Sequence, residues 1–473
     1  MLKKILIANR GEIALRLVRA AQEFGAESVA IYAEDDARSP HVNAADMAVA
    51  LSGSGPAPYL DIAHLIQIAQ HTGCDSVHPG YGFLSERADF ARACTQAGLR
   101  FIGPTPEQLE LFGDKAAARA LAQQHQVALM PGSQSAVTLE QARAFLSEQL
   151  TLGHGMVIKA VGGGGGRGMR VVTTLDELDQ SYARCVSEAR AAFGVDGVYV
   201  ERLMARARHV EIQVLGDGRE VMSLGERECS LQRRFQKLVE MAPSPSLPSH
   251  LRDQITQSAL RMARAVAYTG LGTFEFLVDE HSQDLPWVFI EANARLQVEH
   301  TVTEQVTGLD LVQLQMGVAQ GRSLVELGLD PSRPVATQGY AIQWRINAER
   351  MREDGMALPS TGRLTCFELP AGPGMRVDTH GYAGAELSPH YDTLLAKLIV
   401  SSGSPRFADV CRRARRALAE CRIEGVITNL PLLQAIAAHE AFDAQTVHTR
   451  FVEQILPDLL RSEERRVGKE CLR

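Results

Sequence analysis

Polar and apolar side chains alternate between positions 291 and 299, and the polar ones are of types that do chemistry. The even positions are Ala, Ala, Leu and Val, and the odd positions are Glu291, Asn293, Arg295, Gln297 and Glu299. Alternate side chains of an extended chain point to opposite faces, and alternation alone usually marks only a solvated strand. Here a fully apolar run, 287–290, leads into the stretch. We therefore interpret it as a buried strand that delivers acid, amide and base into a site.

A second strand-like segment, 272–278, has Glu275 as its only charge. If a polar turn centred on Gln283 joins the two strands in a hairpin, Glu275 lies directly opposite Glu291. Cross-strand neighbours lie about 5 Å apart, where like charges repel. Two carboxylates and the amide oxygen of Asn293 would suit Mg²⁺, which takes oxygen ligands and usually keeps a phosphate in its shell. The alternative is a different register, with both acids in solvent.

The polar face cannot be straight throughout. At about 3.3 Å per residue, Glu291 and Glu299 would lie roughly 26 Å apart in a straight strand. A metal-bound phosphate and the group that attacks it must come into contact. We therefore expect the strand to end near Asn293 or Arg295 and the chain to return, so that Gln297–Glu299 faces the same site.

The composition is that of a multidomain globular protein. The chain has 473 residues, of which 45% are hydrophobic and 22% charged, with a formal net charge of −7. This balance argues against nucleic acid or an anionic membrane as a partner. No segment approaches the roughly 20 apolar residues that span a bilayer, and the N-terminal apolar run is too short for a signal peptide. The 8 cysteines show no zinc-like or Cys-x-x-Cys spacing, so we expect a reduced, cytoplasmic protein.

The first unit, residues 1–112, alternates strand-like and helix-like segments, which predicts a parallel α/β sheet. Strands are expected at 4–8, 28–32, 76–78 and 100–102, and helices at 12–24 and 60–71. The first strand–helix turn lacks Gly-x-Gly-x-x-Gly, so no NAD site is predicted. The loop 78–86 holds Tyr81 between two glycines. It is either a ligand-binding loop at the carboxyl end of a strand or a plain structural turn, with even odds.

The second unit, residues 113–325, has two lysines placed to meet a phosphate. Lys115 precedes an alanine-rich helix, and Lys159 lies inside a short apolar strand. Five glycines follow at 162–166, and their backbone N–H groups suit the covering of phosphates. The Gly-Lys-Ser/Thr ending of a P-loop is missing, and the alternative is a flexible linker. Because strand-like segments bracket the glycines, we favour a phosphate-covering hairpin.

Further strands of this unit are expected at 198–204 and 209–214, the latter with His209 and two more polar side chains on one face. A lone histidine of this kind is more often structural than a ligand. The densest charge cluster follows at 226–237. We interpret it by default as a solvated loop, although an acid-rich metal site needs cations nearby to hold anionic substrates.

The third unit, residues 330–455, has an α+β pattern. Arg345 lies inside an apolar strand at 340–349, and a basic amphipathic helix is expected at 406–421. An arginine in such a strand is paired or functional rather than a free surface charge. Residues 461–473 have almost no apolar content, so we expect a disordered or non-native tail. The chain is thus predicted to be an α/β and α+β multidomain protein.

The order of these motifs resembles biotin carboxylase, an ATP-grasp ligase of biotin-dependent carboxylases. The resemblance spans about residues 1–455. It rests on the segments 7–14, 78–86, 113–115, 159–169, 208–211, 232–234, 291–300, 345–349 and 391–392, together with Glu275. The resemblance implies a Rossmann-like N-terminal domain, a central ATP-grasp domain whose mobile glycine-rich lid covers about 130–204, and an α+β C-terminal domain.

The resemblance also implies roles for the matching residues. ATP would be held by Lys115, Lys159, Gly165, Gly166, Glu201, Leu203, Met204, His209, Glu275 and Glu291. Mg²⁺, or Mn²⁺ in its place, would be held by Glu275, Glu291 and Asn293. Bicarbonate would be bound by Lys237, Arg295, Gln297, Val298 and Glu299, and biotin by Arg345 and Tyr81. The implied catalytic residues are Arg295, Lys237 and Glu299, with Glu299 as the base that deprotonates bicarbonate.

The implied reaction has two steps. Bicarbonate attacks the γ-phosphate of ATP to give carboxyphosphate and ADP, and carboxyphosphate then supplies CO₂ to N1 of biotin. Such phosphoryl transfer needs mainly positioning and charge neutralisation, and a guanidinium group matches bicarbonate or a ureido oxygen. This is the first half-reaction of carboxylases such as acetyl-CoA carboxylase in fatty acid biosynthesis. The sequence leaves the final acceptor open.

The sequence has no Ala-Met-Lys-Met-like biotin attachment site and no region large enough for a carboxyltransferase. We therefore expect a separate subunit that receives biotin on a biotin carboxyl carrier protein and works with carboxyltransferase subunits. The family is often dimeric, so a homodimer is expected.

The sequence departs from the family pattern in three places. Phe235 stands where the family usually has a nucleotide-contacting histidine, Ala292 and Ala294 replace bulkier residues, and the turn before Glu291 is longer than usual. Two alternatives remain. Another ATP-grasp ligase, such as a carbamoyl-phosphate synthase-like domain, would lack the Arg295–Glu299 pair together with Arg345. An inactive nucleotide-binding regulatory or scaffold subunit is encouraged only by Phe235.

Overall fold

The computed structural model describes residues 2–133, 135–161, 168–193, 197–282, 284–352 and 355–456. The N-terminal part contains a parallel sheet in the order β3-β2-β1-β4-β5. Its strands are β1 (Lys4–Ile7), β2 (Glu27–Tyr32), β3 (Met47–Ala50), β4 (Ser76–His78) and β5 (Arg100–Phe101). The predicted parallel sheet is confirmed, and β3 is added to its edge.

Helices connect these strands: α1 (Gly11–Phe24), α2 (Pro40–Ala44), α3 (Ile62–His71), α4 (Ala88–Gln96) and α5 (Pro106–Gly113). Helix α1 ends at Gly25, whose φ of 84° lies in the left-handed region that glycine tolerates at a helix C-terminus. Helix α3 begins two residues later than expected, because the Asp61 side chain accepts a hydrogen bond from the His64 N–H and caps the helix there.

One eight-stranded sheet runs through the central and C-terminal parts of the chain, in the order β13-β12-β9-β10-β11-β14-β21-β19. Its strands are β9 (Arg208–Asp217), β10 (Val221–Arg233), β11 (Gln236–Ala242), β12 (Thr269–Val278), β13 (Trp287–Asn293), β14 (Tyr340–Asn347), β19 (Met375–Thr379) and β21 (Leu394–Ser402). Strand β11 pairs with β14, with Val239 opposite Trp344. The second and third predicted units therefore share a sheet.

The charged segment 226–237 is not a solvated loop, and this expectation was wrong. It forms the end of β10 and the start of β11, and Arg227 and Glu228 are fully buried. Each of these charges has a partner: Arg227 contacts Glu211, and Glu228 contacts Arg208. Charged side chains enter a sheet when opposite charges meet them there, and that pairing cannot be read from the segment itself.

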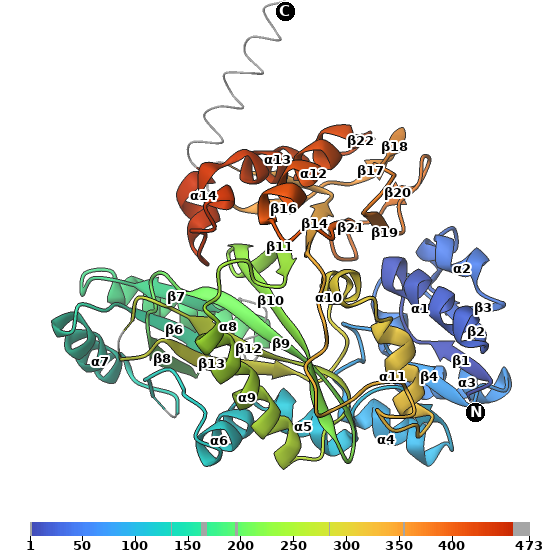
Figure 1. Ribbon diagram of the computed structural model, residues 1–473, viewed down its shortest axis with the longest axis horizontal. Helices are drawn as coiled ribbons and strands as arrows, with labels where there is room; N and C mark the ends of the chain where they lie inside the picture. Colours follow the sequence, from blue (N-terminus) through green and yellow to red (C-terminus); the bar gives the residue numbers. More distant parts are fainter. Residues whose placement is uncertain are drawn as a thin grey trace, which may run out of the picture.

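Helices cover both faces of the large sheet. They are α9 (Ser249–Ala265), α10 (His300–Thr307), α11 (Leu311–Ala319), α12 (Phe407–Glu420), α13 (Leu430–Ala438) and α14 (Glu440–Asp443). In the C-terminal half, Trp344 and Leu398 pack with α12 and α13 in one core, whereas Ala341 and Ile399 pack with α10 in another. Figure 1 shows β14 and β21 between these two layers. Odd-numbered positions of both strands therefore face α10.

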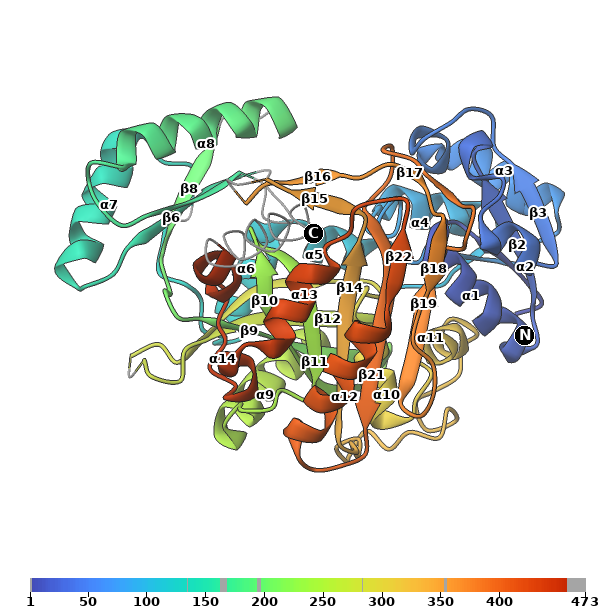
Figure 2. The ribbon, with the colours of Figure 1, turned by 90° about the horizontal axis from the view of Figure 1, so that it is seen from above.

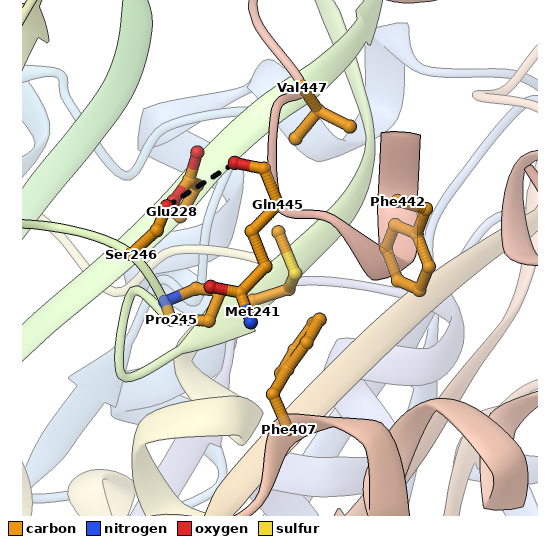
Figure 3. A pocket seen from close by; sticks show the side chains of 8 residues that line it. All are labelled: Glu228, Met241, Pro245, Ser246, Phe407, Phe442, Gln445 and Val447. Carbon is orange, nitrogen blue, oxygen red and sulfur yellow. Dashed lines mark hydrogen bonds between the residues drawn. The ribbon is translucent and has the colours of Figure 1, made fainter. Parts of the chain in front are cut away.

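The C-terminal helices also reach the turn that follows β11. Figure 3 shows Phe407 and Phe442 beside Met241, and the Ser246 hydroxyl directed at the Gln445 carbonyl oxygen, 3.4 Å away. The small pocket between them holds none of the expected site residues. It is a packing contact between the C-terminal helices and the edge of β10 and β11.

A smaller sheet, in the order β7-β6-β8, lies at the end of the molecule opposite the N-terminal sheet (Figures 1 and 2). It comprises β6 (Met156–Ala160), β7 (Met169–Val172) and β8 (Val198–Arg202), with α7 (Leu139–Thr151) and α8 (Leu178–Phe193), and α6 (Lys115–Gln124) precedes it. Strands β6 and β7 pair antiparallel, so the expected hairpin around the glycine run is confirmed. The glycines at 162–166, Gly165 and Gly166 among them, lie outside the described residues.

Short two-stranded pairs complete the C-terminal part. They are β15 (Glu349–Met351) with β16 (Ala357–Pro359), β17 (Gly362–Arg363) with β20 (Glu386–Leu387), and β18 (Cys366–Glu368) with β22 (Arg422–Glu424). Within the described ranges, no helix is both long enough and apolar enough to cross a membrane. Cysteines of the described residues are free thiols. The expected tail, 461–473, lies outside the described residues.

We expect the Trp344→Ala variant to lose about 3–5 kcal/mol of unfolding free energy, because it leaves a large cavity in the C-terminal core. Trp344 is fully buried and its ring centroid lies 5.6 Å from that of Phe442. Urea denaturation followed by circular dichroism measures the change. The control is Ile427→Ala, since Ile427 is exposed and its truncation should cost within about 0.5 kcal/mol. Equal losses in the two variants would contradict the packing described here.

Candidate functional site

The hairpin that was expected to bring two acids together is present. Strands β12 and β13 pair antiparallel with Glu275 directly opposite Glu291, and a bulge follows Glu275. Glu275 is buried, whereas Glu291 is partly exposed and lies 3.7 Å from the Lys115 ammonium group. The register is therefore confirmed, and the bulge turns the remainder of the hairpin relative to this pair.

The chain leaves the strand at Asn293 and returns to the same site, as the distance argument required. Gln297 donates from Nε2 to Glu275 Oε1 at 2.9 Å. Helix α10 begins at His300, directly after Glu299. A helix N-terminus favours negative charge, so this placement suits a carboxylate or an anion at Glu299.

The Lys237 ammonium group lies among three carboxylates. It is 2.7 Å from Glu211, 3.0 Å from Glu275 and 2.6 Å from Glu299. Burial disfavours the charged form of Lys237, but the surrounding anions raise its pKa well above the usual value. Burial also disfavours the charged form of Glu299 and would raise its pKa. The Lys237, Arg345 and Arg227 cations outweigh this effect and hold the pKa of Glu299 well below its usual range. These shifts keep both Lys237 and Glu299 in their charged forms.

Arg227, which was not among the expected site residues, lies behind this cluster. Its guanidinium group is fully buried and forms an ion pair with Glu211. It also donates to Gln213 at 2.7 Å, to Thr273 at 3.1 Å and to Gln297 at 3.1 Å. It thereby ties β9, β10, β12 and the returning loop together. The alternation of charges along β10 was the available signal for it.

Arg345 joins the other side of the cluster. It points from β14 to Glu299, with 3.0 Å between Nη2 and Oε2, and forms a second ion pair with Glu240 of β11. The strand position and the pairing expected for Arg345 are both found. Glu240 was missed, because it lies in a strand that the sequence analysis did not anticipate. Burial raises the pKa of Glu240, an effect that Arg345 opposes.

Arg295 lies at the junction of strand and loop. Its Nη2 donates to the Asn293 Oδ1 at 3.0 Å, its Nη1 donates to the Leu296 carbonyl oxygen at 3.3 Å, and its Nε lies 3.1 Å from Glu86. Glu86 belongs to the loop 78–86, so Arg295 connects that loop to the polar cluster.

The residues expected at a nucleotide gather where β8 ends. Glu201 pairs with Lys159 of β6 and, at 2.8 Å, with Arg119 of α6. Leu203 is buried and its N–H donates to the Gly155 carbonyl oxygen at 2.9 Å. Met204, which follows it, is partly exposed. Arg119 was not identified from the sequence, since a helix surface arginine carries no distinguishing pattern.

His209 connects this region with the acids. Its Nε2 lies 2.7 Å from Glu275 Oε2, and its Nδ1 lies 2.5 Å from Gln232 Nε2. Burial alone would raise the pKa of Glu275, but Lys237 and His209 hold it well below the usual value. His209 therefore contacts both Glu275 and Gln232 and is not an isolated structural histidine.

The donor set suits a hard divalent cation. Glu275 and Glu291 are directly opposite each other on neighbouring strands, and the Asn293 amide donates from Nδ2 to Glu275 Oε1 at 2.9 Å. Ligand atoms of His209, Glu211 and Glu275 also lie within 4.8 Å of one another. Oxygen-rich sets of this kind fit Mg²⁺, although the Asn293 amide oxygen here accepts from Arg295.

The family departures have simple placements. Phe235 lies at the turn between β10 and β11 with a φ of 65°, and its side chain is exposed. Ala292 and Ala294 are buried in the core with Phe274 and Phe289 behind the hairpin. Small side chains at these two positions therefore lie against large aromatic ones.

We expect Arg227→Met to lower the unfolding free energy by about 3 kcal/mol or more, because it leaves the buried Glu211 with less compensation. The double variant Arg227→Met/Glu211→Gln should recover a substantial part of that loss. Urea denaturation of the wild type, both single variants and the double variant gives the coupling energy. Strictly additive losses would show that the two side chains do not depend on each other.

Models of three known domains match the chain. They are "Biotin carboxylase, N-terminal domain" over residues 1–109, "Carbamoyl-phosphate synthase L chain, ATP binding domain" over 114–327 and "Biotin carboxylase C-terminal domain" over 343–454. The biotin carboxylase of Nostoc sp. is 44% identical, over 96% of this chain and 99% of its own length. Mitochondrial pyruvate carboxylase of Mus musculus is 46% identical over 96% of this chain, which spans 38% of that protein.

Solved structures agree with these relatives. The biotin carboxylase domain of a single-chain bacterial carboxylase is 45% identical, with a TM-score of 0.86, and 97% of this chain and 98% of that one are covered. The biotin carboxylase domain dimer of Hydrogenobacter thermophilus 2-oxoglutarate carboxylase, solved with MgADP, ADP and bicarbonate, is 39% identical with a TM-score of 0.88, and the match covers 97% of this chain and 98% of that chain. Two of the three matching models are specific to one family, and a relative of that family matches over almost its full length, so the chain belongs to the biotin carboxylases, which are ATP-grasp ligases.

Proposed function

We propose that this protein carboxylates biotin with bicarbonate and ATP, through carboxyphosphate, and releases ADP and phosphate. One observation carries the proposal: Glu299 lies between Lys237 and Arg345. Lys237 also contacts Glu275 of the expected metal site, and Arg345 is the residue expected to bind biotin. The base that acts on bicarbonate thus bridges the nucleotide side and the biotin side.

Glu299 has a feature that fits a substrate-activated base. The cations that keep its pKa low, Lys237 and Arg345, are those that would bind bicarbonate and the biotin ureido oxygen. An entering anion competes with Glu299 for these cations. The cations then lower the pKa of Glu299 less than before. Glu299 then becomes a stronger base once bicarbonate is in place. Arg295, Gln297 and the Val298 backbone would complete the bicarbonate site.

The nucleotide would lie between the large sheet and the β6–β8 sheet. Lys115 and Lys159 would meet its phosphates, Gly165 and Gly166 would cover them, and Glu201, Leu203 and Met204 would meet adenine and ribose. His209 would complete the set from β9. Lys159 pairs with Glu201, so a phosphate would compete with that carboxylate for the ammonium group.

Mg²⁺, or Mn²⁺ in its place, would be held by Glu275, Glu291 and Asn293, and would neutralise phosphate charge during transfer. For Asn293 this requires its amide oxygen to exchange Arg295 for the cation, which frees the guanidinium group for bicarbonate. Tyr81 and Arg345 would hold the biotin ring, with Arg345 stabilising negative charge on the ureido oxygen.

The proposed setting is that of a biotin-dependent carboxylase. Biotin would arrive on a biotin carboxyl carrier protein, carboxyltransferase subunits would use the product, and the enzyme would act in the cytoplasm as a homodimer. Acetyl-CoA carboxylase in fatty acid biosynthesis is one such setting, and the pyruvate carboxylase relatives represent another. The proposed domains are 1–112, 113–325 with a lid at about 130–204, and 330–455.

The alternatives explain less of the site. A carbamoyl-phosphate synthase-like ligase shares the ATP-binding unit, but it gives no role to the contact between Arg345 and Glu299 across the two units. An inactive scaffold gives no role to the buried cations around Glu299. Phe235, the residue that encouraged this alternative, lies in an exposed turn.

We expect ADP release to require both bicarbonate and free biotin, and Glu299→Gln and Arg295→Ala each to lower kcat about a hundredfold or more. Both variants should bind ATP with near wild-type affinity, measured by calorimetry. ADP release that ignores biotin would reject the biotin carboxylase function. No turnover combined with intact ATP binding would favour the scaffold.

Removal of divalent cations with EDTA should abolish turnover, because the charges of ATP and the metal-site carboxylates would then be uncompensated. Added Mg²⁺ or Mn²⁺ should restore it. Glu291→Gln should raise the Mg²⁺ concentration needed for half-maximal rate, whereas Asp284→Asn, in the exposed connection of the same hairpin, should leave it unchanged. Full activity in EDTA would rule out the metal site.

A further inference from the structure

Lys397, a buried lysine outside the expected site, contacts the backbone of the loop that carries Glu299. Lys397 lies in β21 and its side chain is 0% exposed. It stands directly opposite Arg345 of β14 on one side and Asp378 of β19 on the other. Directly opposed residues of antiparallel strands point to the same face, so Arg345, Lys397 and Asp378 form a row across the sheet. That face is the one covered by α10.

The Lys397 ammonium group reaches four parts of the chain. Its Nζ donates to the Val298 carbonyl oxygen at 3.2 Å and lies 3.0 Å from Glu12 Oε2 of α1. It is 3.7 Å from Asp378 Oδ2 and 5.9 Å from the centre of the Tyr81 ring. Two segments with proposed substrate roles, the loop through Val298 and the loop that holds Tyr81, thus share this cation.

Arg345 and Lys397 contact two consecutive residues of the loop, Glu299 and Val298. Arg345 contacts the Glu299 carboxylate, and Lys397 contacts the backbone carbonyl of Val298. The loop 297–299 lies beyond the end of β13 at Asn293, so it is not held by pairing within the sheet. Side chains of the C-terminal strands therefore hold Val298 and Glu299 in place of strand pairing, while Arg227 and Glu275 of the central part hold Gln297.

Two cations directly opposite each other in a sheet repel, and burying an ammonium group costs several kcal/mol unless it is compensated. Here Asp378 and Glu12 provide the compensation. Asp378 also pairs with Arg376 at 2.8 Å, whereas the cation in contact with Glu12 is Lys397. Burial raises the pKa of Glu12 to about 7, and Lys397 opposes that rise. Hydrophobic packing would avoid these costs, which points to a positional role for the cation.

The loop that carries Tyr81 is held by Asn9, which lies just before α1. Asn9 donates from Nδ2 to the carbonyl oxygens of Pro79 and Tyr81, at 2.7 and 2.8 Å. Gly80 between them has a φ of +65°, and an added Cβ would lie 2.9 Å from the Asn9 amide nitrogen. The Tyr81 loop is thus fixed to the start of α1, whose Glu12 contacts Lys397.

We propose that Lys397 is a positioning residue that fixes the 297–299 loop relative to the Tyr81 loop, and so sets the spacing between bicarbonate and biotin. The spacing claim rests on the proposed function, whereas the anchoring of the loop does not. Lys397 contacts no substrate itself and acts through the Val298 carbonyl. Small displacements of reacting groups cost up to about a hundredfold in rate, so a loosened loop should be visible in kinetics.

Two variants test the proposal. Lys397→Met keeps the volume but removes the ammonium group, and it leaves Glu12 uncompensated. The double variant Lys397→Met/Glu12→Gln removes both charges, so it should fold even where the single variant does not. The control is Arg208→Met/Glu228→Gln, which neutralises an equally buried ion pair of the same sheet whose further partners are Ser230 and Ser244.

With free biotin as acceptor, we expect the Lys397→Met/Glu12→Gln variant to lower kcat/KM for bicarbonate about tenfold or more, with KM for ATP within about twofold of wild type. The control should change neither constant by more than about twofold. A bicarbonate constant that stays at the wild-type value would overturn the positioning role. So would parallel losses for bicarbonate and ATP, because those indicate general disruption.

Hydrogen exchange separates this inference from the proposed function. Without any substrate, backbone amides of peptides covering 296–302 should exchange about tenfold faster in the Lys397 double variant than in wild type, with the control unchanged. If the wild type shows no biotin-dependent turnover, the proposed function fails, but this measurement still decides whether Lys397 anchors the loop. Unchanged exchange in the double variant would reject the anchoring.

Discussion

The ammonium group of Lys237 is the interaction on which the arrangement of this site depends. Three carboxylates converge on it from β9, β12 and the loop after β13. Without a cation between them, Glu211, Glu275 and Glu299 would repel one another in a buried environment. Arg227 compensates the same cluster from behind. The strands and the loop can approach this closely only because the buried charges compensate one another. Charge compensation therefore determines the geometry of the site.

The large sheet extends that constraint across the molecule. Because β11 pairs with β14, strands from the central and C-terminal parts share one register, and Arg345 reaches Glu299 from the C-terminal part. The N-terminal part joins through Arg295 with Glu86 and through Lys397 with Glu12. The loop 297–299 thus contacts the central and C-terminal parts directly, and it is linked to the N-terminal part through Arg295 and Lys397. Chemistry that needs a nucleotide, an anion and a ring in one place suits such a junction.

The expectation of a solvated loop at 226–237 was wrong for a physical reason. A run of charges is usually solvated, and local sequence says nothing about partners that lie elsewhere. Glu211 and Arg208, which meet Arg227 and Glu228, are on the neighbouring strand. Arg119, Glu240 and Lys397 likewise have partners that are distant in the sequence, and no local pattern marks these residues. The alternation in 291–299 was informative because acid, amide and base followed one apolar run.

The sequence alone determined the strand–helix order of the N-terminal sheet, the hairpin that pairs Glu275 with Glu291, and the need for the chain to turn back after Asn293. These depend on local periodicity and on the fixed rise of an extended chain, both of which a sequence displays. Only the tertiary structure decided that the central and C-terminal parts share a sheet, that Lys237 lies at the centre of three acids, and that Lys397 lies beneath Val298. Those features arise from pairing between distant segments, where burial and charge compensation select among arrangements that a linear pattern leaves open.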